Sequence, residues 1–294
     1  MRAGFIGLGT MGAPMARNLA RYLATPAGKD SAPLVVWTRT PDAVAALQAG
    51  GAPVIGASSP ADVFAQADVV FLMLANSAAI DEVLGRHTPA FTAMLRGRIV
   101  VAMGTTAPAY SAGLEADIVA AGGSYVEAPV SGSRVPAEQG ALVGMVAGEP
   151  GVVALVAPLL PAFCERSFDC GAVPGALRMK LAVNLFLITM VSGLAEATHL
   201  ARQLGLDLSV FRAIVDAGPM ASKVSTIKLG KLVEQDYAAQ ASAADVLMNA
   251  TLIADAAREA GVASPLLDIS RDLFARTTAL GHGKADMAAV ILAF

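Results

Sequence analysis

The chain has 294 residues, of which 55% are hydrophobic and 15% are charged, and its formal net charge is −3. This charge balance gives no electrostatic reason to bind nucleic acid or an anionic membrane surface. The length is sufficient for two domains with separate cores. The sequence starts directly with a strand pattern and no apolar signal segment precedes it, so we expect no secretory signal and a cytoplasmic location.

Cysteine and histidine are too few and too scattered for a disulfide framework or a metal centre. Cys164 and Cys170 match neither a zinc motif nor a CxxC redox pair, which predicts two reduced thiols. His87, His199 and His282 lie far apart in sequence, so we expect no metal site.

A glycine-rich motif near the N-terminus is the strongest local signal. Ala3–Ile6 reads as a buried strand and Ala13–Ala20 as an amphipathic helix. The segment between them has the form GxGxxG and consists of Gly7, Leu8, Gly9, Thr10, Met11 and Gly12. A strand, this motif and a helix in succession predict a dinucleotide site, with the pyrophosphate at the helix N-terminus. The alternative is an ordinary glycine-rich turn.

The end of the second strand bears on the choice of dinucleotide. Leu34–Trp37 reads as this strand, and a helix over 41–50 follows, with Thr40 as its N-cap. An acid that would bind the ribose 2′-hydroxyl of NAD is missing at the strand end, because the first one, Asp42, lies inside the helix. Arg39 and Thr40 stand there instead and suit a 2′-phosphate, so we favour NADP over NAD. A solvated surface arginine is the alternative.

Further apolar strands alternate with helices up to about residue 170. The predicted strands are Asp68–Leu74, Arg98–Ala102, Ser124–Glu127, Leu142–Ala147 and Ser167–Asp169. Continuous apolar strands separated by helices indicate a parallel sheet covered on both faces. We therefore predict an α/β fold whose N-terminal part is a Rossmann-type, doubly wound parallel sheet.

The second part of the chain is predicted to be entirely helical. A long helix over 174–204 joins the two parts, and the later helices are expected at 209–217, 223–234, 242–260 and 266–281. The boundary falls near 160–175, which gives a cofactor domain of residues 1–165 and a helical substrate and dimerisation domain of residues 166–294. The apolar run Leu181–Leu194 is shorter than a membrane span, so we expect it to be buried in a core or in a homodimer or homotetramer.

Two polar segments are candidates for the chemical centre. Ser131 and Gly132 follow a predicted strand and could hold a carboxylate, although a plain turn is an equal alternative. Lys180 and Asn184 share one face of the long helix. If that face lines a crevice, Lys180 is a candidate general acid and base; otherwise its side chain extends along the apolar surface to solvent.

Four segments in this order resemble the β-hydroxyacid dehydrogenase family, which includes 3-hydroxyisobutyrate dehydrogenases and glyoxylate/succinic semialdehyde reductases. They are GFIGLGTMGAPMARNLA near the N-terminus, MGTTAP at 103–108, EAPVSGSRVPAEQGALVGMVAG at 127–148 and MKLAVN at 179–184. The resemblance implies that Lys180 is the catalytic lysine and that Ser131, Gly132 and Asn184 bind substrate. It also places Thr105 beside the nicotinamide and substrate, and Leu74, Ala75 and Asn76 along the cofactor.

The chain departs from the family pattern at two places. Val173-Pro174-Gly175-Ala176 replaces the usual Gly-x-Gly before the lysine, and Ala244-Asp245 stands where members commonly have Lys-Asp. The second change removes one positive charge from the expected site, which favours a less anionic substrate. Asn249 is a candidate to compensate.

The resulting functional prediction is hydride transfer between NADP(H) and a small 3-hydroxy acid, semialdehyde or 2-oxo acid, with Lys180 moving the proton. Two alternatives remain open: an NADPH-dependent imine reductase, which usually lacks a lysine at this position, and a catalytically silent NADP-binding module. We expect a small carboxylate substrate and neither a nucleic-acid nor a membrane partner.

Overall fold

A computed structural model describes residues 1–25 and 32–294. The chain divides into two compact units, Met1–Lys180 and Leu181–Phe294. The sequence-predicted boundary between residues 165 and 166 is earlier than this division. It would cut a strand, Cys164–Asp169, that pairs with the sheet of the first unit.

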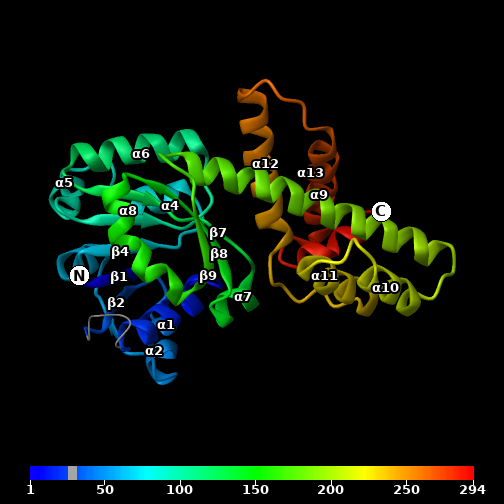
Figure 1. Ribbon diagram of the computed structural model, residues 1–294, viewed down its shortest axis with the longest axis horizontal. Helices are drawn as coiled ribbons and strands as arrows, with labels where there is room; N and C mark the ends of the chain where they lie inside the picture. Colours follow the sequence, from blue (N-terminus) through cyan, green and yellow to red (C-terminus); the bar gives the residue numbers. More distant parts are fainter. Residues whose placement is uncertain (26–31) are drawn as a thin grey trace. The chain divides into compact units, whose positions relative to one another are not determined.

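The first unit is built on a sheet with helices on both faces (Figure 1). Its strands are β1 (Ala3–Ile6), β2 (Leu34–Trp37), β3 (Val54–Gly56), β4 (Val69–Leu72), β5 (Ile99–Ala102), β6 (Ser124–Glu127), β7 (Val130–Ser131), β8 (Leu142–Gly148) and β9 (Cys164–Asp169). Its helices are α1 (Gly12–Leu23), α2 (Asp42–Ala49), α3 (Pro60–Gln66), α4 (Ser77–Leu84), α5 (Pro89–Leu95), α6 (Pro108–Ala120), α7 (Arg134–Gln139), α8 (Pro150–Val156) and the 3₁₀ segment η2 (Ala157–Ala162).

The strand order identifies the fold. Strands β3-β2-β1-β4-β5-β6 are neighbours in this order and all pair in parallel. This is the doubly wound Rossmann order, and the strand sequence reverses between β1 and β4. The sheet continues through β8, which pairs antiparallel with β6 and β7 and parallel with β9. The predicted fold class is therefore confirmed.

Alternating side chains of the central strands supply two separate cores. In β4, Val69 and Phe71 belong to the cluster that contains Met15 of α1, whereas Val70 and Leu72 belong to the cluster on the opposite face. All four β4 side chains are buried. Burial on both faces explains why the parallel strands read as continuous apolar runs.

Three local predictions need correction. Pro41 stands at the N-cap of α2 and no side chain caps that helix, so the prediction of Thr40 as the cap is wrong; Thr40 accepts the Ala43 N–H through its backbone carbonyl instead. The short strands β3 and β7 were not predicted. The last predicted helix is α-helical only as far as Thr277; a π turn follows it, in which Gly281 has a positive φ of 90°.

The second unit contains only helices, apart from one isolated bridge between Ser242 and Asp286. Its elements are the greater part of α9 (Gly175–Gln203), α10 (Leu208–Ala217), α11 (Lys223–Glu234), α12 (Ala243–Glu259), α13 (Pro265–Thr277), the π turn η3 (Thr278–His282) and the 3₁₀ segment η4 (Met287–Ala293). Buried residues of α9, α11, α12, α13 and η4 form its core. By length and composition α9 alone, among the helices of the described residues, could cross a membrane, but a core helix of a soluble protein meets the same criterion.

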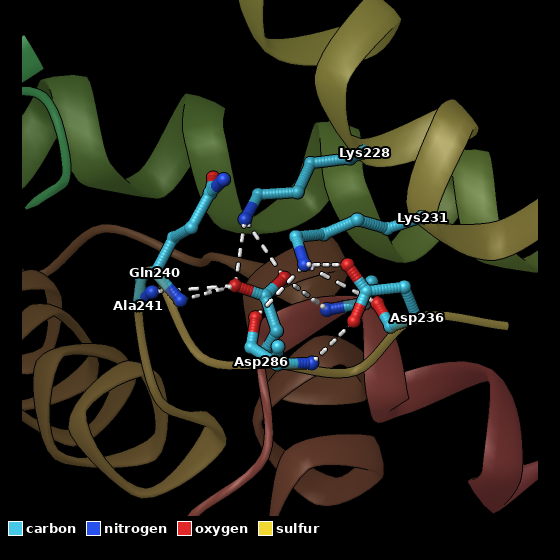
Figure 2. Close-up of polar contacts among 8 residues, drawn as sticks. Lys228, Lys231, Asp236, Gln240, Ala241 and Asp286 are labelled. Atoms are coloured by element: carbon cyan, nitrogen blue, oxygen red, sulfur yellow. Dashed lines mark hydrogen bonds and ion pairs between the residues drawn. The ribbon is translucent and has the colours of Figure 1, made fainter. Parts of the chain in front are cut away.

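A buried ion pair holds the C-terminal segment to α11 (Figure 2). Asp286 is fully buried, and both of its carboxylate oxygens accept hydrogen bonds from Lys228 Nζ, at 2.8 and 2.9 Å. The same carboxylate accepts N–H bonds from Gln240, Ala241 and Ala288. Next to this pair, Lys231 Nζ donates to the Asp236 carboxylate and to the Ala238 carbonyl. The loop before α12 and the chain before η4 are thereby fixed around one carboxylate.

We expect Asp286→Ala to lower the free energy of unfolding by about 3–5 kcal/mol, because it leaves Lys228 buried without its counter-ion. Denaturant unfolding followed by circular dichroism measures the change. Asp255→Ala is the control, because Asp255 forms an exposed ion pair with Arg258 and its loss should change stability by no more than about 1 kcal/mol. Equal unfolding midpoints for the two variants would contradict this prediction.

Candidate functional site

The glycine loop lies where the strand order reverses. Gly7 has a φ of 98°, and its N–H donates to the Trp37 carbonyl at the end of β2. A Cβ on Gly7 would lie 2.3 Å from the Met73 carbonyl oxygen, so the loop packs against the end of β4. Gly7 therefore sits at the carboxyl ends of β1, β2 and β4, the edge at which ligands bind in open parallel sheets.

The loop leaves space at the N-terminus of α1. A Cβ built on Gly9 has no atom of the described residues within 4 Å, whereas one on Gly12 would lie 1.9 Å from the Gly7 carbonyl oxygen. Within the described part of the chain no side chain caps α1, and the first turn of this helix contains no acid. A close backbone approach together with an uncapped helix N-terminus fits a pyrophosphate. The residues present therefore suit a dinucleotide, and Leu8, Thr10 and Met11 complete the loop.

Arg39 and Thr40 are exposed beyond the end of β2. Asp42 begins α2, so it does not occupy the strand-end position where an acid would bind a ribose hydroxyl. An exposed guanidinium at this strand end suits an anionic group such as a 2′-phosphate.

The loops after β4 and β5 adjoin the glycine loop. The Leu74 side chain would lie 3.0 Å from a Cβ on Gly7, and the Leu74 carbonyl oxygen 2.8 Å from one on Gly104. The structure thereby brings the segments of Leu74 and Thr105 to the dinucleotide edge. Ala75 and Asn76 are exposed, and the Asn76 side chain accepts the Ala79 N–H as the cap of α4.

Ser131 ends the short strand β7, and Gly132, which follows it, has a φ of 128°. This conformation favours glycine, and a Cβ there would also lie 2.6 Å from the Leu142 side chain. Ser131 pairs with Val143 of β8, which fixes its backbone at the edge of the sheet.

Lys180 is a charged residue that the first unit buries. It lies on α9 and is only 7% exposed, so its side chain does not extend to solvent as the alternative interpretation required. Burial lowers the pKa of Lys180 to about 8. An amine with such a pKa can both donate and accept a proton near neutral pH.

Asn184, one turn further along α9, is oriented by α12. Its Nδ2 donates to Asn249 Oδ1 at 2.9 Å, and Asn249 Nδ2 donates to the Asp245 carbonyl. Because that carbonyl can only accept, it fixes the orientation of both amides. The Asn184 Oδ1 atom is buried and has no hydrogen-bond partner among the residues that the structure describes, so it can accept a hydrogen bond from a ligand. Ala244 is exposed near the start of the same helix.

Neither cysteine is part of this site. Both are free, and burial raises the pKa of the Cys164 thiol to about 12, which makes it unreactive. Within residues 1–25 and 32–294, no group of three or more His, Cys, Asp and Glu side chains could hold a metal ion.

A Rossmann sheet with an uncapped glycine loop, followed by a helical unit, defines a two-domain oxidoreductase that uses a nicotinamide dinucleotide. Residues 2–171 match the family described as the NAD-binding domain of 6-phosphogluconate dehydrogenase, and residues 176–294 match that described as NAD-binding of NADP-dependent 3-hydroxyisobutyrate dehydrogenase. The chain belongs to the β-hydroxyacid dehydrogenase family.

Known relatives match over nearly the whole chain. Glyoxylate/succinic semialdehyde reductase 2 of Arabidopsis thaliana is 31% identical over 98% of this chain and 78% of its own length. The crystal structure of 3-hydroxyisobutyrate dehydrogenase from Salmonella typhimurium superposes with a TM-score of 0.87 at 27% identity, covering 100% of both chains. A structure of Psf3 in complex with NADP⁺ and 2-OPP gives a TM-score of 0.86 at 26% identity, covering 99% of each chain.

Proposed function

We propose that this enzyme transfers a hydride reversibly between NADP(H) and a small 3-hydroxy acid, semialdehyde or 2-oxo acid, with Lys180 as the proton donor and acceptor. The observation that carries the proposal is the burial of Lys180, which brings its pKa close to neutral pH. Burial that moves the pKa of a lysine towards neutral pH is typical of lysines that act as acid and base at active sites.

During reduction of the carbonyl substrate, each residue of the proposed site has its own role. NADPH, when bound, supplies the hydride that reduces the carbonyl carbon. The Lys180 ammonium donates a proton to the carbonyl oxygen and stabilises the negative charge that develops on it. Ser131 and the Gly132 backbone bind the substrate carboxylate, while Asn184 accepts a hydrogen bond through its free Oδ1. In the oxidising direction the neutral amine of Lys180 removes the hydroxyl proton.

Ala244 favours a substrate with a single carboxylate. The lysine that family members commonly carry at this position would add a positive charge, and this chain has a methyl group there. Without that lysine, the negative charge of a second substrate carboxylate would have no cation to pair with at this position.

A substrate panel tests the function. Semialdehydes, 2-oxo acids and hydroxy acids are assayed with NADP(H) and NAD(H) by nicotinamide absorbance, with cyclic imines alongside. Turnover of carbonyl or hydroxy acids with NADP(H) supports the proposal. Turnover of imines alone would assign the chain to the imine reductases, and cofactor binding without turnover would favour a silent NADP-binding module.

Arg39→Ser tests the cofactor preference. We expect the Kd for NADPH to rise by at least about tenfold, because a charged hydrogen bond to the 2′-phosphate is lost. NADH lacks this phosphate and is the internal control, so its Kd should not rise. Fluorescence titration measures both constants, and a parallel loss for NADH would refute the assignment.

We also propose a cytoplasmic homodimer or homotetramer that covers one face of α9. Met179, Val183, Phe186 and Leu200 are exposed apolar residues of this helix, and Phe186 is 68% exposed. The spacing of the first three places them on one stripe, as in a helix that packs against a partner. Light scattering in detergent-free buffer measures the oligomeric state, and a monodisperse monomer would exclude this arrangement.

A further inference from the structure

Glu127 is a buried carboxylate that the proposed reaction does not use. It ends β6 and is fully buried within the first unit. Its Oε2 accepts N–H bonds from Ala176 and Leu177, both at 3.1 Å. Its Oε1 accepts a hydrogen bond from Ser111 Oγ at 2.5 Å, and this hydroxyl also contacts the Tyr125 hydroxyl at 2.8 Å.

All the contacts of this carboxylate suit an ionised group. Three donors point at its two oxygens, and two of these donors are backbone N–H groups in the first turn of α9. A negative charge at a helix N-terminus is stabilised by the helix dipole as well as by the hydrogen bonds. Burial raises the pKa of Glu127, and the Ser111 and backbone donors oppose that shift.

The position of Glu127 connects two parts of the proposed site. Four residues further along the chain is Ser131, at the end of β7, and Lys180 lies one turn beyond Ala176 on α9. Glu127, Ser131 and Lys180 all belong to the unit Met1–Lys180. The carboxylate therefore ties the first turn of α9, one turn before the lysine, to the strand that leads into the substrate loop.

We propose that Glu127 is a positioning residue for hydride transfer, because its carboxylate holds the first turn of α9 and so sets the Lys180 ammonium against the Ser131–Gly132 loop. This inference rests on the proposed role of Lys180. Glu127 would then affect kcat through the position of Lys180, without touching the substrate or the cofactor.

The chain offers a matched control. Glu149 also accepts two backbone N–H bonds at a helix N-terminus, from Gly151 and Val152 of α8, but it is exposed and its helix carries none of the proposed site residues. Glu149→Ala removes a helix-capping glutamate from the same unit without altering the first turn of α9.

Kinetics of the purified full-length variants test the proposal. We expect Glu127→Ala to lower kcat by about 100-fold, since small misplacements of a reacting group have effects of this order, with the Kd for NADPH unchanged. Glu127→Gln keeps an acceptor for the α9 N–H groups, so its kcat should stay within about tenfold of the wild type. Glu149→Ala should keep the wild-type kcat. A Glu127→Ala enzyme with wild-type kcat, or one whose loss Glu149→Ala reproduces, would overturn the proposal.

A second measurement is independent of turnover. Amide hydrogen exchange of the NADP⁺-bound chain should become faster in the first turn of α9 for Glu127→Ala, and in α8 for Glu149→Ala. Unchanged exchange at Ala176 and Leu177 in Glu127→Ala would refute the proposed hold of Glu127 on the first turn of α9, even if no substrate were found. If the wild type turns over no compound of the panel while exchange responds as expected, the proposed function is wrong, but Glu127 still holds the first turn of α9.

Discussion

Replacing Lys180 by alanine is expected to lower kcat by about 10²–10⁴-fold in both directions, the usual contribution of a general acid or base. The Kd for NADPH should stay the same, because the glycine loop and Arg39 bind the cofactor in this account. Lys180→Met is the companion variant, since it keeps most of the buried volume and removes only the charge. Steady-state kinetics and fluorescence titration measure the two quantities.

The pH dependence of the wild type links this loss to the ammonium group. Reduction needs the protonated lysine, so its rate should fall as the pH rises through about 8, the value to which burial lowers the pKa of Lys180. Oxidation needs the neutral amine and should become faster over the same range. Both steps in the profile should vanish in Lys180→Met. A variant with near-normal turnover, or one that retains the pH step, would remove Lys180 from the mechanism.

The sequence predicts those parts of the fold whose signal is local. The strand Ala3–Ile6 and the helix Lys223–Glu234 have the predicted bounds, because each contains its own apolar pattern and boundary residues. Strand β3 has two exposed residues out of three, and its conformation comes from pairing with β2. Such a strand has too little pattern of its own to be recognised before its neighbour is placed.

The candidate site likewise contains features that the sequence reveals and features that it does not. The glycine motif and the lysine are visible in the sequence because contiguous residues carry them. The burial of Lys180 was not visible in the sequence, since a lysine on an apolar helix is more commonly expected to extend its side chain to solvent. Glu127 was missed because its donors are 16, 49 and 50 residues away along the chain. The Asn184–Asn249 contact spans 65 residues, so periodicity within one helix cannot reveal it.

Two glycines of the same motif should respond to alanine in different ways. For Gly12→Ala the new Cβ would overlap the Gly7 carbonyl oxygen, which is backbone and cannot move without deforming the loop. We expect a loss of about 1–3 kcal/mol of stability in the cofactor-free protein, together with weak NADPH binding. Thermal unfolding without cofactor measures the first effect.

Gly9→Ala should leave the cofactor-free protein intact and still impair binding. Its Cβ would meet no atom of residues 1–25 and 32–294 within 4 Å, so stability should change by less than about 0.5 kcal/mol. The methyl group would instead occupy space that the backbone offers to the pyrophosphate, and we expect the Kd for NADPH to rise by at least about tenfold. If Gly9→Ala bound NADPH normally, the space beside Gly9 would not be the phosphate site; if it unfolded as readily as Gly12→Ala, the open geometry of the loop would be wrong. A loss of stability in Gly12→Ala, together with a loss of NADPH affinity at unchanged stability in Gly9→Ala, would place the pyrophosphate against the Gly9 backbone.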